Sequence, residues 1–173
     1  MTGRETKRIG VVVVAYNAES TLAPVLDRIP EGLREQLDSV LVCDDYSQDD
    51  TYEVALRYQE ATPELPVSVF RRGMNLGYGG NQKVAYRWAI DRGLDIVVLL
   101  HGDGQYAPEH MSDLIDPLLA GDCDAVLGSR MMAPGAARKG GMPLYKRVGN
   151  RILTKIANRA VGLELSEWHS GYR

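Results

Sequence analysis

The sequence contains few cysteines, no long apolar run and, over its last third, almost no acidic residues. Two cysteines in 173 residues, Cys43 and Cys123, are too few for a disulfide framework. Each lies in or beside an apolar stretch, so we interpret both as small buried side chains of a reduced chain. We therefore expect a cytoplasmic protein.

No apolar run reaches the ~18 residues that a membrane-spanning helix needs. The N-terminal stretch MTGRETKRIG leads into a short valine run that no small-residue cleavage site follows, which argues against a secretory signal peptide. The first predicted strand also lacks the glycine-rich, basic loop that we expect of an enzyme that forms sugar nucleotides. The composition, 45% apolar and 25% charged, predicts a single domain over residues 1–173.

Charge is divided unevenly along the chain. Residues 1–124 hold 11 Lys/Arg and 21 Asp/Glu, whereas residues 125–173 hold 9 Lys/Arg and 2 Asp/Glu. No acid occurs between Asp124 and Glu164. This asymmetry predicts an anionic partner for the C-terminal part. Nucleic acid is a poor candidate, because the acidic remainder of the chain would repel it.

Short apolar runs alternate with helical patterns. The runs predict strands over residues 8–16, 39–45, 66–72, 95–103 and 124–130. Helices are predicted over about 18–29, 49–60 and 79–91, and a fourth begins at Pro108. The alternation predicts an α/β fold, a Rossmann-like open and mainly parallel sheet with helices on both faces.

Polar residues collect where the predicted strands end. In open α/β sheets, ligands bind outside the carboxyl ends of the strands. Those ends carry Tyr16-Asn17, Asp44-Asp45, the stretch from Asn75 to Gly80, HGDGQ over residues 101–105, and Ser129-Arg130. The sequence therefore predicts a ligand site along this edge.

The stretch HGDGQ has the composition of a metal and phosphate site. His101, Asp103 and Gln105 are two residues apart, so an extended chain would point them the same way. A carboxylate and an amide oxygen suit Mg²⁺ or Mn²⁺, with phosphate oxygens and water completing the shell. An ordinary turn between a strand and a helix is the simpler interpretation of these residues alone.

A basic amphipathic helix is predicted over residues 145–161. Arg147, Arg151, Lys155 and Arg159 recur every fourth residue, apart from the apolar positions. A solvated face is one interpretation of this pattern. Contact with anionic lipid or with a lipid phosphate is the other.

Six motifs in this order resemble the family 2 glycosyltransferases of GT-A fold, of the dolichol-phosphate mannose synthase and polyprenyl-phosphate glycosyltransferase type. They are VVVVAYN, CDDYSQDDT, NLGYGGNQKVA, HGDGQYAPE, VLGSRM and WHSGYR. The resemblance implies a nucleotide-sugar donor, linked to uridine or guanosine diphosphate. It also implies a divalent metal ion and transfer of a sugar with inversion.

The resemblance also implies roles for single residues. Nucleotide-sugar binding falls to Tyr16, Asn17, Asp45, Gly77, Lys83 and Asp103. Metal binding is assigned to Asp103 and Gln105, and whether His101 is also a metal ligand is left open. Catalysis falls to Asp103, Arg130 and Arg173, and the acceptor phosphate or a lipid surface to Arg147, Arg151 and Lys155.

The sequence departs from the family pattern at three places. The family's D-x-D is H-x-D here, with His101 first, and Ala18 stands where the family often has an acid. The chain stops directly after SGYR, from which we expect a catalytic domain truncated at its C-terminus.

The shortage of acids after Asp124 favours an acceptor that needs no general base. A phosphate is already largely ionised near neutral pH, since its second pKa is about 6. We therefore expect an inverting glycosyltransferase acting on a polyprenyl phosphate, with peripheral membrane contact at the cytoplasmic face. A non-catalytic or incomplete nucleotide-sugar-binding domain is the alternative.

Overall fold

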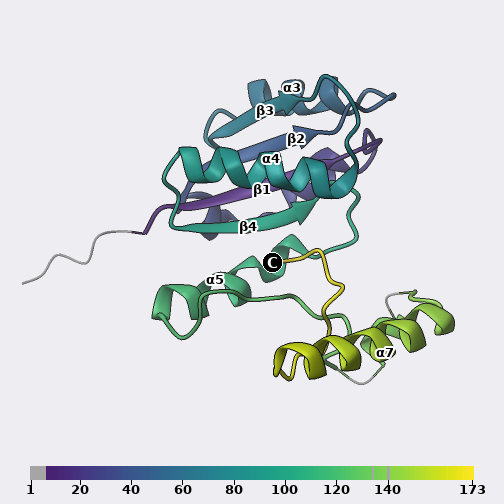
Figure 1. The fold of residues 1–173 in the computed structure, drawn as a ribbon. Coiled ribbons are helices and arrows are strands. Elements are labelled where there is room, and N and C mark those ends of the chain that lie inside the picture. The colour runs from purple at the N-terminus through teal and green to yellow at the C-terminus, as the bar shows by residue number, and fades with distance from the viewer. Residues whose placement is uncertain (1–6, 134, 140) are drawn as a thin grey trace, which may run out of the picture. The chain divides into compact units, whose positions relative to one another are not determined.

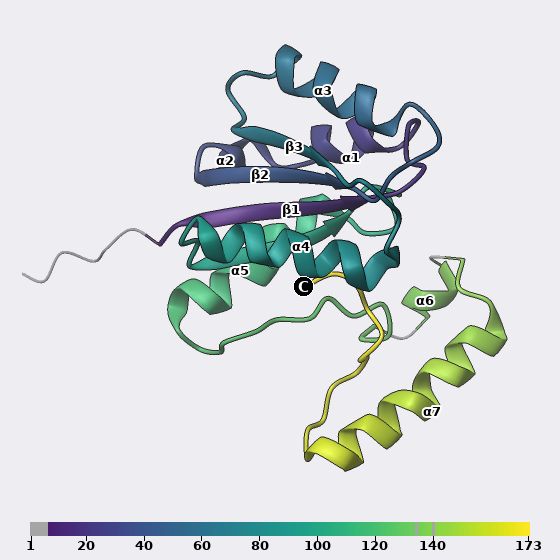
Figure 2. The same ribbon diagram turned by 45° about the horizontal axis from the view of Figure 1, so that its top comes forward.

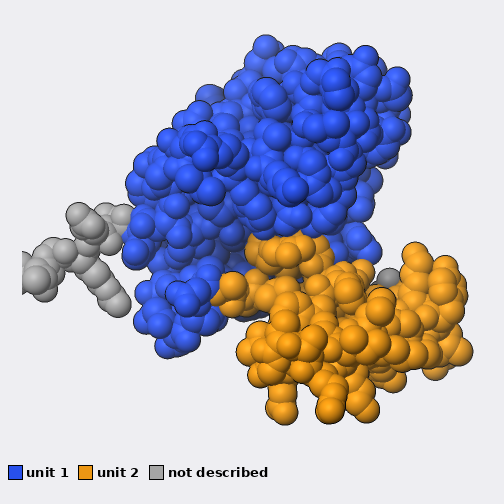
Figure 3. Space-filling model, viewed as in Figure 1, with its two compact units in different colours: residues 1–124 blue, residues 125–173 orange. Residues whose placement is uncertain are grey.

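The structure is a computed structural model that describes residues 7–133, 135–139 and 141–173. The chain divides into two compact units, Met1–Asp124 and Ala125–Arg173, coloured separately in Figure 3. Each unit is described by itself. The expected single domain over residues 1–173 stays a prediction.

Four parallel strands form the sheet of the first unit (Figure 1). In the order of the sheet they are β3 (Val67–Arg71), β2 (Leu37–Asp44), β1 (Ile9–Ala15) and β4 (Ile96–His101). In register, Val14 of β1 lies opposite Cys43 of β2 and His101 of β4. The three strands therefore end at the same level, and their following loops start together.

Helices cover both faces of this sheet (Figures 1 and 2). One face carries α4 (Gly77–Asp91), and the other carries α1 (Leu22–Asp27), α3 (Thr51–Ala61) and α5 (Met111–Ala120). Short turns of helix are α2 (Glu31–Arg34) and η1 (Pro108–His110). The α/β fold with a parallel sheet is confirmed.

The core depends on β-branched side chains and on small residues opposite them. Every residue of β1 is buried, as the run IGVVVVA predicts for a strand covered on both faces. Across α4, Ala85 and Ala89 face Val12 and Val14, and their small side chains let the helix lie close to the sheet.

Three sequence expectations were wrong in detail. The helix expected over about 18–29 is shorter, because residues 18–21 form a turn in which the Thr21 and Leu22 N–H groups both donate to the Ala18 carbonyl, and α1 spans only Leu22–Asp27. The strand expected over 124–130 is absent; a strand needs a ladder, and Gly128 N–H instead donates to Tyr172 C=O at 2.8 Å. Cys123 is exposed, because it lies in the turn that follows α5.

The second unit contains α6 (Ala136–Lys139) and α7 (Leu144–Val161), which matches the amphipathic helix expected over 145–161. Thr154 is the buried residue of α7. Large apolar side chains of this helix are exposed, among them Val148, Ile152 and Ile156. In the described parts of the chain, no helix is long and apolar enough to cross a bilayer.

The two thiols are predicted to differ strongly in reactivity. Burial raises the pKa of Cys43 to about 12, against a partial opposing effect of the nearby Arg72 charge. Because the thiolate is the reactive form, buried Cys43 stays inert at pH 8 while exposed Cys123 reacts. Titration with an aromatic disulfide reagent should count one fast thiol in the native chain and two in denaturant.

Replacement of Cys123 by alanine is the control for that count. The Cys123→Ala variant should lose the fast reaction and keep one thiol that reacts after unfolding. Two fast thiols in the native wild type would contradict the burial of Cys43.

Candidate functional site

Hydrogen bonds between side chains and backbone join the loop after β1 to the loop after β2. Buried Asp44 accepts hydrogen bonds from the Ser47 N–H at 3.2 Å and from the Ser47 hydroxyl. The Ser47 Oγ accepts the Asn17 N–H at 2.9 Å, and Asn17 Oδ1 accepts the Gln48 N–H at 2.9 Å. Burial raises the pKa of Asp44, and the Ser47 hydrogen bonds oppose that rise.

Two residues of these loops adopt a left-handed backbone. Asn17 has φ of 47° and Tyr46 has φ of 64°. A positive φ is uncommon for residues other than glycine, and for a bulky tyrosine it is strained. Such strain persists where surrounding contacts enforce it, and it gathers at ligand sites. The hydrogen bonds around Ser47 supply these contacts.

Asp45 is almost fully buried and is held in place from two directions. Its Oδ1 accepts the Leu76 N–H at 3.1 Å and lies 3.4 Å from Arg72 Nε. Arg72 also donates from Nη1 to the Gly80 carbonyl at 2.8 Å. The carboxylate is thereby tied to the beginning of α4, while its side chain lines the pocket described next.

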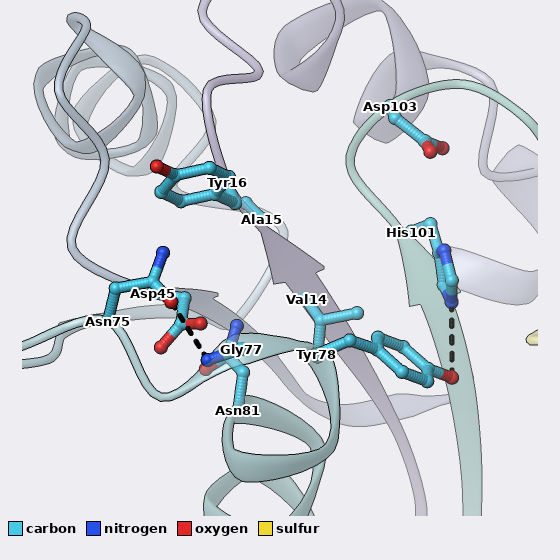
Figure 4. A pocket seen from close by; sticks show the side chains of 10 residues that line it. All are labelled: Val14, Ala15, Tyr16, Asp45, Asn75, Gly77, Tyr78, Asn81, His101 and Asp103. Atoms are coloured by element: carbon cyan, nitrogen blue, oxygen red, sulfur yellow. Dashed lines mark hydrogen bonds between the residues drawn. The ribbon is translucent and has the colours of Figure 1, made fainter.

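A pocket of about 330 Å³ opens at the carboxyl ends of β1, β2 and β4, beside the beginning of α4 (Figure 4). β1 is the strand at which the order of the sheet reverses, the usual ligand position in such folds. The lining residues are Val14, Ala15, Tyr16, Asp45, Asn75, Gly77, Tyr78, Asn81, His101 and Asp103.

The two sides of this pocket differ in chemistry. Tyr16, Asp45 and Asn75 lie on one side in Figure 4, and His101 and Asp103 lie on the other. Asp103 is exposed, and its Oδ1 accepts the Gln105 N–H at 2.9 Å. A buried carboxylate thus stands across the pocket from a solvent-accessible one.

His101 is enclosed by two tyrosines. Its Nε2 lies 3.4 Å from Tyr78 Oη, and its ring makes a T-shaped contact with the Tyr106 ring at a centroid distance of 4.9 Å. These contacts give the imidazole a defined orientation beside Asp103.

The residues present fit a divalent cation that takes one carboxylate from the protein and its other ligands from a bound phosphate compound and water. Among the described residues, no group of three or more His, Cys, Asp and Glu side chains could hold a metal ion. Magnesium in phosphate-binding sites commonly uses one or two carboxylates, with phosphate oxygens and water as its other ligands. The exposed carboxylate of Asp103 in the pocket meets that requirement.

The structure brings together five of the residues expected at this site: Tyr16, Asp45, Gly77, His101 and Asp103. Asn17 braces the loops, and Lys83 lies exposed on α4 without lining the pocket. The Gln105 side chain is exposed and is also absent from the lining.

Sequence reasoning missed Tyr78 and Asn81. Asn81 is buried, donates from Nδ2 to the Cys43 carbonyl at 2.7 Å and accepts the Cys43 thiol at Oδ1. The spacing of three residues places Tyr78 and Asn81 on one helix face. This spacing, together with an asparagine on the same helix face as the buried alanines Ala85 and Ala89, could have identified the two residues from the sequence.

The predicted residues of the second unit lie in two settings. Arg130 pairs with buried Glu167, and Arg173 is part-buried at the end of the chain. Arg151 and Lys155 line a pocket of about 540 Å³, together with Arg159 and residues of the segment after α7. Arg147 is part-buried on α7 and lies outside that pocket's lining.

Two curated relatives align with nearly the whole chain. UDP-N-acetylglucosamine--dolichyl-phosphate N-acetylglucosaminyltransferase of Methanococcus voltae is 28% identical, over 96% of this chain and 68% of its own length. Polyprenol monophosphomannose synthase of Mycolicibacterium smegmatis is 29% identical, over 99% of this chain and 63% of its own length. The chain therefore spans about two thirds of the length of these relatives.

A solved structure shares the fold. Glucosyl-3-phosphoglycerate synthase from Mycobacterium tuberculosis, in complex with Mn²⁺, UDP-glucose and glycerol 3-phosphate, superposes with a TM-score of 0.52. The sequences are 27% identical, over 67% of this chain and 41% of that chain. The fold is the GT-A fold. Residues 10–167 match the protein family described as "Glycosyl transferase family 2", and the chain belongs to this family.

Proposed function

We propose that the chain is the catalytic part of an inverting glycosyltransferase that moves a sugar from a nucleotide donor to a polyprenyl phosphate. One observation carries the proposal: the pocket at the switch point of the sheet sets buried Asp45 opposite exposed Asp103. The first suits a nucleoside, and the second suits a cation bound to a diphosphate. Both curated relatives have names that refer to a lipid phosphate: dolichyl phosphate in one and polyprenol monophosphomannose in the other.

The nucleoside is proposed to lie against Tyr16 and Asp45. An aspartate accepts hydrogen bonds from a base N–H or a ribose hydroxyl. Tyr16 is half-exposed, so its ring offers an apolar face at the mouth of the pocket. We propose a uridine or guanosine diphosphate sugar as the donor.

The diphosphate is proposed to meet the beginning of α4. Gly77, with φ of 71°, lines the pocket there, and no side chain of that residue blocks an approach to the backbone. The Gly77 N–H itself donates to Asn75 Oδ1 at 2.9 Å, and the positive end of the helix dipole at this N-terminus attracts phosphate. Asp103 would hold a Mg²⁺ or Mn²⁺ ion, with His101 or Gln105 as candidate further ligands, and the ion would neutralise charge on the leaving diphosphate.

The proposed reaction is a single displacement. A phosphate oxygen of the acceptor bonds to the anomeric carbon while the bond from that carbon to the diphosphate oxygen breaks. The nucleoside diphosphate leaves with the electron pair, and the configuration inverts. An ionised phosphate needs no base, and Arg130 and Arg173 are proposed to bind the phosphate groups.

The second unit is proposed to contact a membrane surface that holds the lipid acceptor. Exposed Val148, Ile152 and Ile156 on α7 would insert among lipids, and Arg151 and Lys155 would meet their phosphates. With Arg147 they form the proposed lipid-phosphate surface. A solvated face is the competing interpretation, which vesicle binding tests.

The donor proposal predicts metal-dependent stabilisation by the true nucleotide sugar. Ligand binding adds RT ln(1 + [L]/Kd), or about 2.7 kcal/mol at a concentration of 100 Kd. In a thermal-shift screen of UDP- and GDP-sugars, one donor with Mn²⁺ should raise the melting temperature. Asp103→Asn should remove the part of the shift that requires Mn²⁺.

Asp116→Asn is the matched control, since Asp116 is an exposed carboxylate on α5 outside the pocket. It should keep the full shift. The absence of a shift with every donor would contradict nucleotide-sugar binding. A shift without sugar transfer or donor hydrolysis would instead support a non-catalytic binding domain.

The membrane proposal predicts binding to anionic vesicles. Each basic residue near such a surface adds about 1 kcal/mol. The double variant Arg151→Gln/Lys155→Gln should therefore bind vesicles containing phosphatidylserine roughly 30-fold more weakly in co-sedimentation.

A double variant of equal charge change, Arg57→Gln/Arg87→Gln, is the control. Both residues are exposed on helices of the first unit, and binding should change less than twofold. Equal losses in the two double variants would show a dependence on net charge alone and would contradict the role of α7.

A further inference from the structure

The second unit buries one carboxylate that the proposed reaction does not use. Glu167 is 1% exposed. Its Oε2 accepts the Arg130 backbone N–H at 2.7 Å, and its Oε1 accepts Arg130 Nε at 3.1 Å, together with Arg130 Nη2. The Asn150 Nδ2 also donates to Oε1, at 2.7 Å. Both oxygens are therefore engaged.

Three segments meet at this carboxylate. Arg130 follows the stretch 124–129, Asn150 lies on α7, and Glu167 belongs to the C-terminal segment. The Thr154 hydroxyl donates to Asn150 Oδ1 at 3.1 Å and so orients the amide nitrogen toward Glu167. Arg130 Nη2 also donates to the His169 carbonyl at 3.1 Å.

These contacts exclude Glu167 as the base that accepts a proton from an acceptor. Burial alone acts to raise its pKa, but the hydrogen bonds from Arg130 and Asn150 outweigh that effect and hold the pKa below its usual range. The carboxylate is ionised and shielded from solvent, and both of its oxygens accept hydrogen bonds. A base needs a lone pair within reach of the reacting proton.

The pair also fixes the geometry of the arginine. A guanidinium is planar, and a carboxylate that binds its Nε and Nη2 edge sets the plane and the direction of the side chain. The extra bond from the Arg130 backbone N–H to the same carboxylate fixes the main chain at that residue. A group held in this way is preorganised to bind a phosphate or a sugar.

We propose that Glu167 is a positioning residue for Arg130, which it holds in the orientation that binds the acceptor phosphate. This role rests on the proposed function. Asn150 and Thr154 complete it, because they hold the carboxylate from α7. Glu167 acts through the arginine and does not touch the reacting atoms.

A double-mutant cycle in the 173-residue chain tests the role. Glu167→Gln keeps the shape of the side chain but presents an amide to the arginine. With the donor found in the thermal-shift screen and polyprenyl phosphate in detergent as acceptor, Glu167→Gln should lower kcat/KM at least tenfold. It should not change the donor Kd. Glu60→Gln, an exposed glutamate on α3, should stay within twofold of wild type.

The cycle separates positioning from a structural or basic role. In an Arg130→Met background, Glu167→Gln should cause no further loss, because the residue it acts through is gone. The pH profile of kcat/KM should fall uniformly in Glu167→Gln without loss of its acidic limb. Arg130→Lys keeps Glu167 and the charge but lacks the planar fork. It should lose activity like Arg130→Met, and it remains informative if Glu167→Gln unfolds.

Distinct results would overturn the inference. Wild-type activity in Glu167→Gln, a full additional loss in the Arg130→Met background, or disappearance of the acidic limb would each reject positioning through Arg130. Wild-type activity in Arg130→Lys would reject the need for the fork. A wild type that binds donor but transfers no sugar would reject the proposed function itself.

Discussion

The first unit depends on the burial of β1 between two parallel neighbours. Each of its residues is buried, and it is hydrogen-bonded to β2 on one side and β4 on the other. Register with both neighbours brings three strand ends to one level, so their polar loops converge. Because the strand order reverses at β1, helices leave on opposite faces and a pocket remains between the loops. A substitution that shifted this register would move Asp45 away from Asp103.

Polar contacts hold the loops that surround the pocket. Asp44 and Ser47 brace the strained backbone at Asn17 and Tyr46, while Arg72 secures Asp45 to the beginning of α4. A buried carboxylate without such partners would be costly, and with them it is rigid. The same loops therefore present Asp45, the acid proposed to bind the nucleoside, at a defined position. His101, between Tyr78 and Tyr106, is oriented in a comparable way beside Asp103.

The second unit shows how a strongly basic segment organises around few acids. Nine cations and two acids occur in residues 125–173, and Glu167 is the acid that lies buried. Its position makes one arginine rigid, while Arg151 and Lys155 remain on the surface of α7. The abundance of positive charge thus serves two physical ends. One arginine is fixed by an ion pair, and other cations face solvent, where they form the surface proposed to meet anionic lipid.

Sequence alone was sufficient for the parallel α/β fold, the longer helices of both units and five pocket residues, because hydrophobic periodicity and strand-end chemistry are local signals. It was also sufficient for the family, through six motifs in order. It was insufficient for the strand expected over 124–130, since a strand exists only with a ladder partner. The sequence also left the state of Glu167 open, and only its contacts with Arg130 and Asn150 decided it. Sequence determined which chemical groups were available, whereas tertiary structure decided their partners and burial, because a side chain's protonation and orientation depend on neighbours distant in the chain.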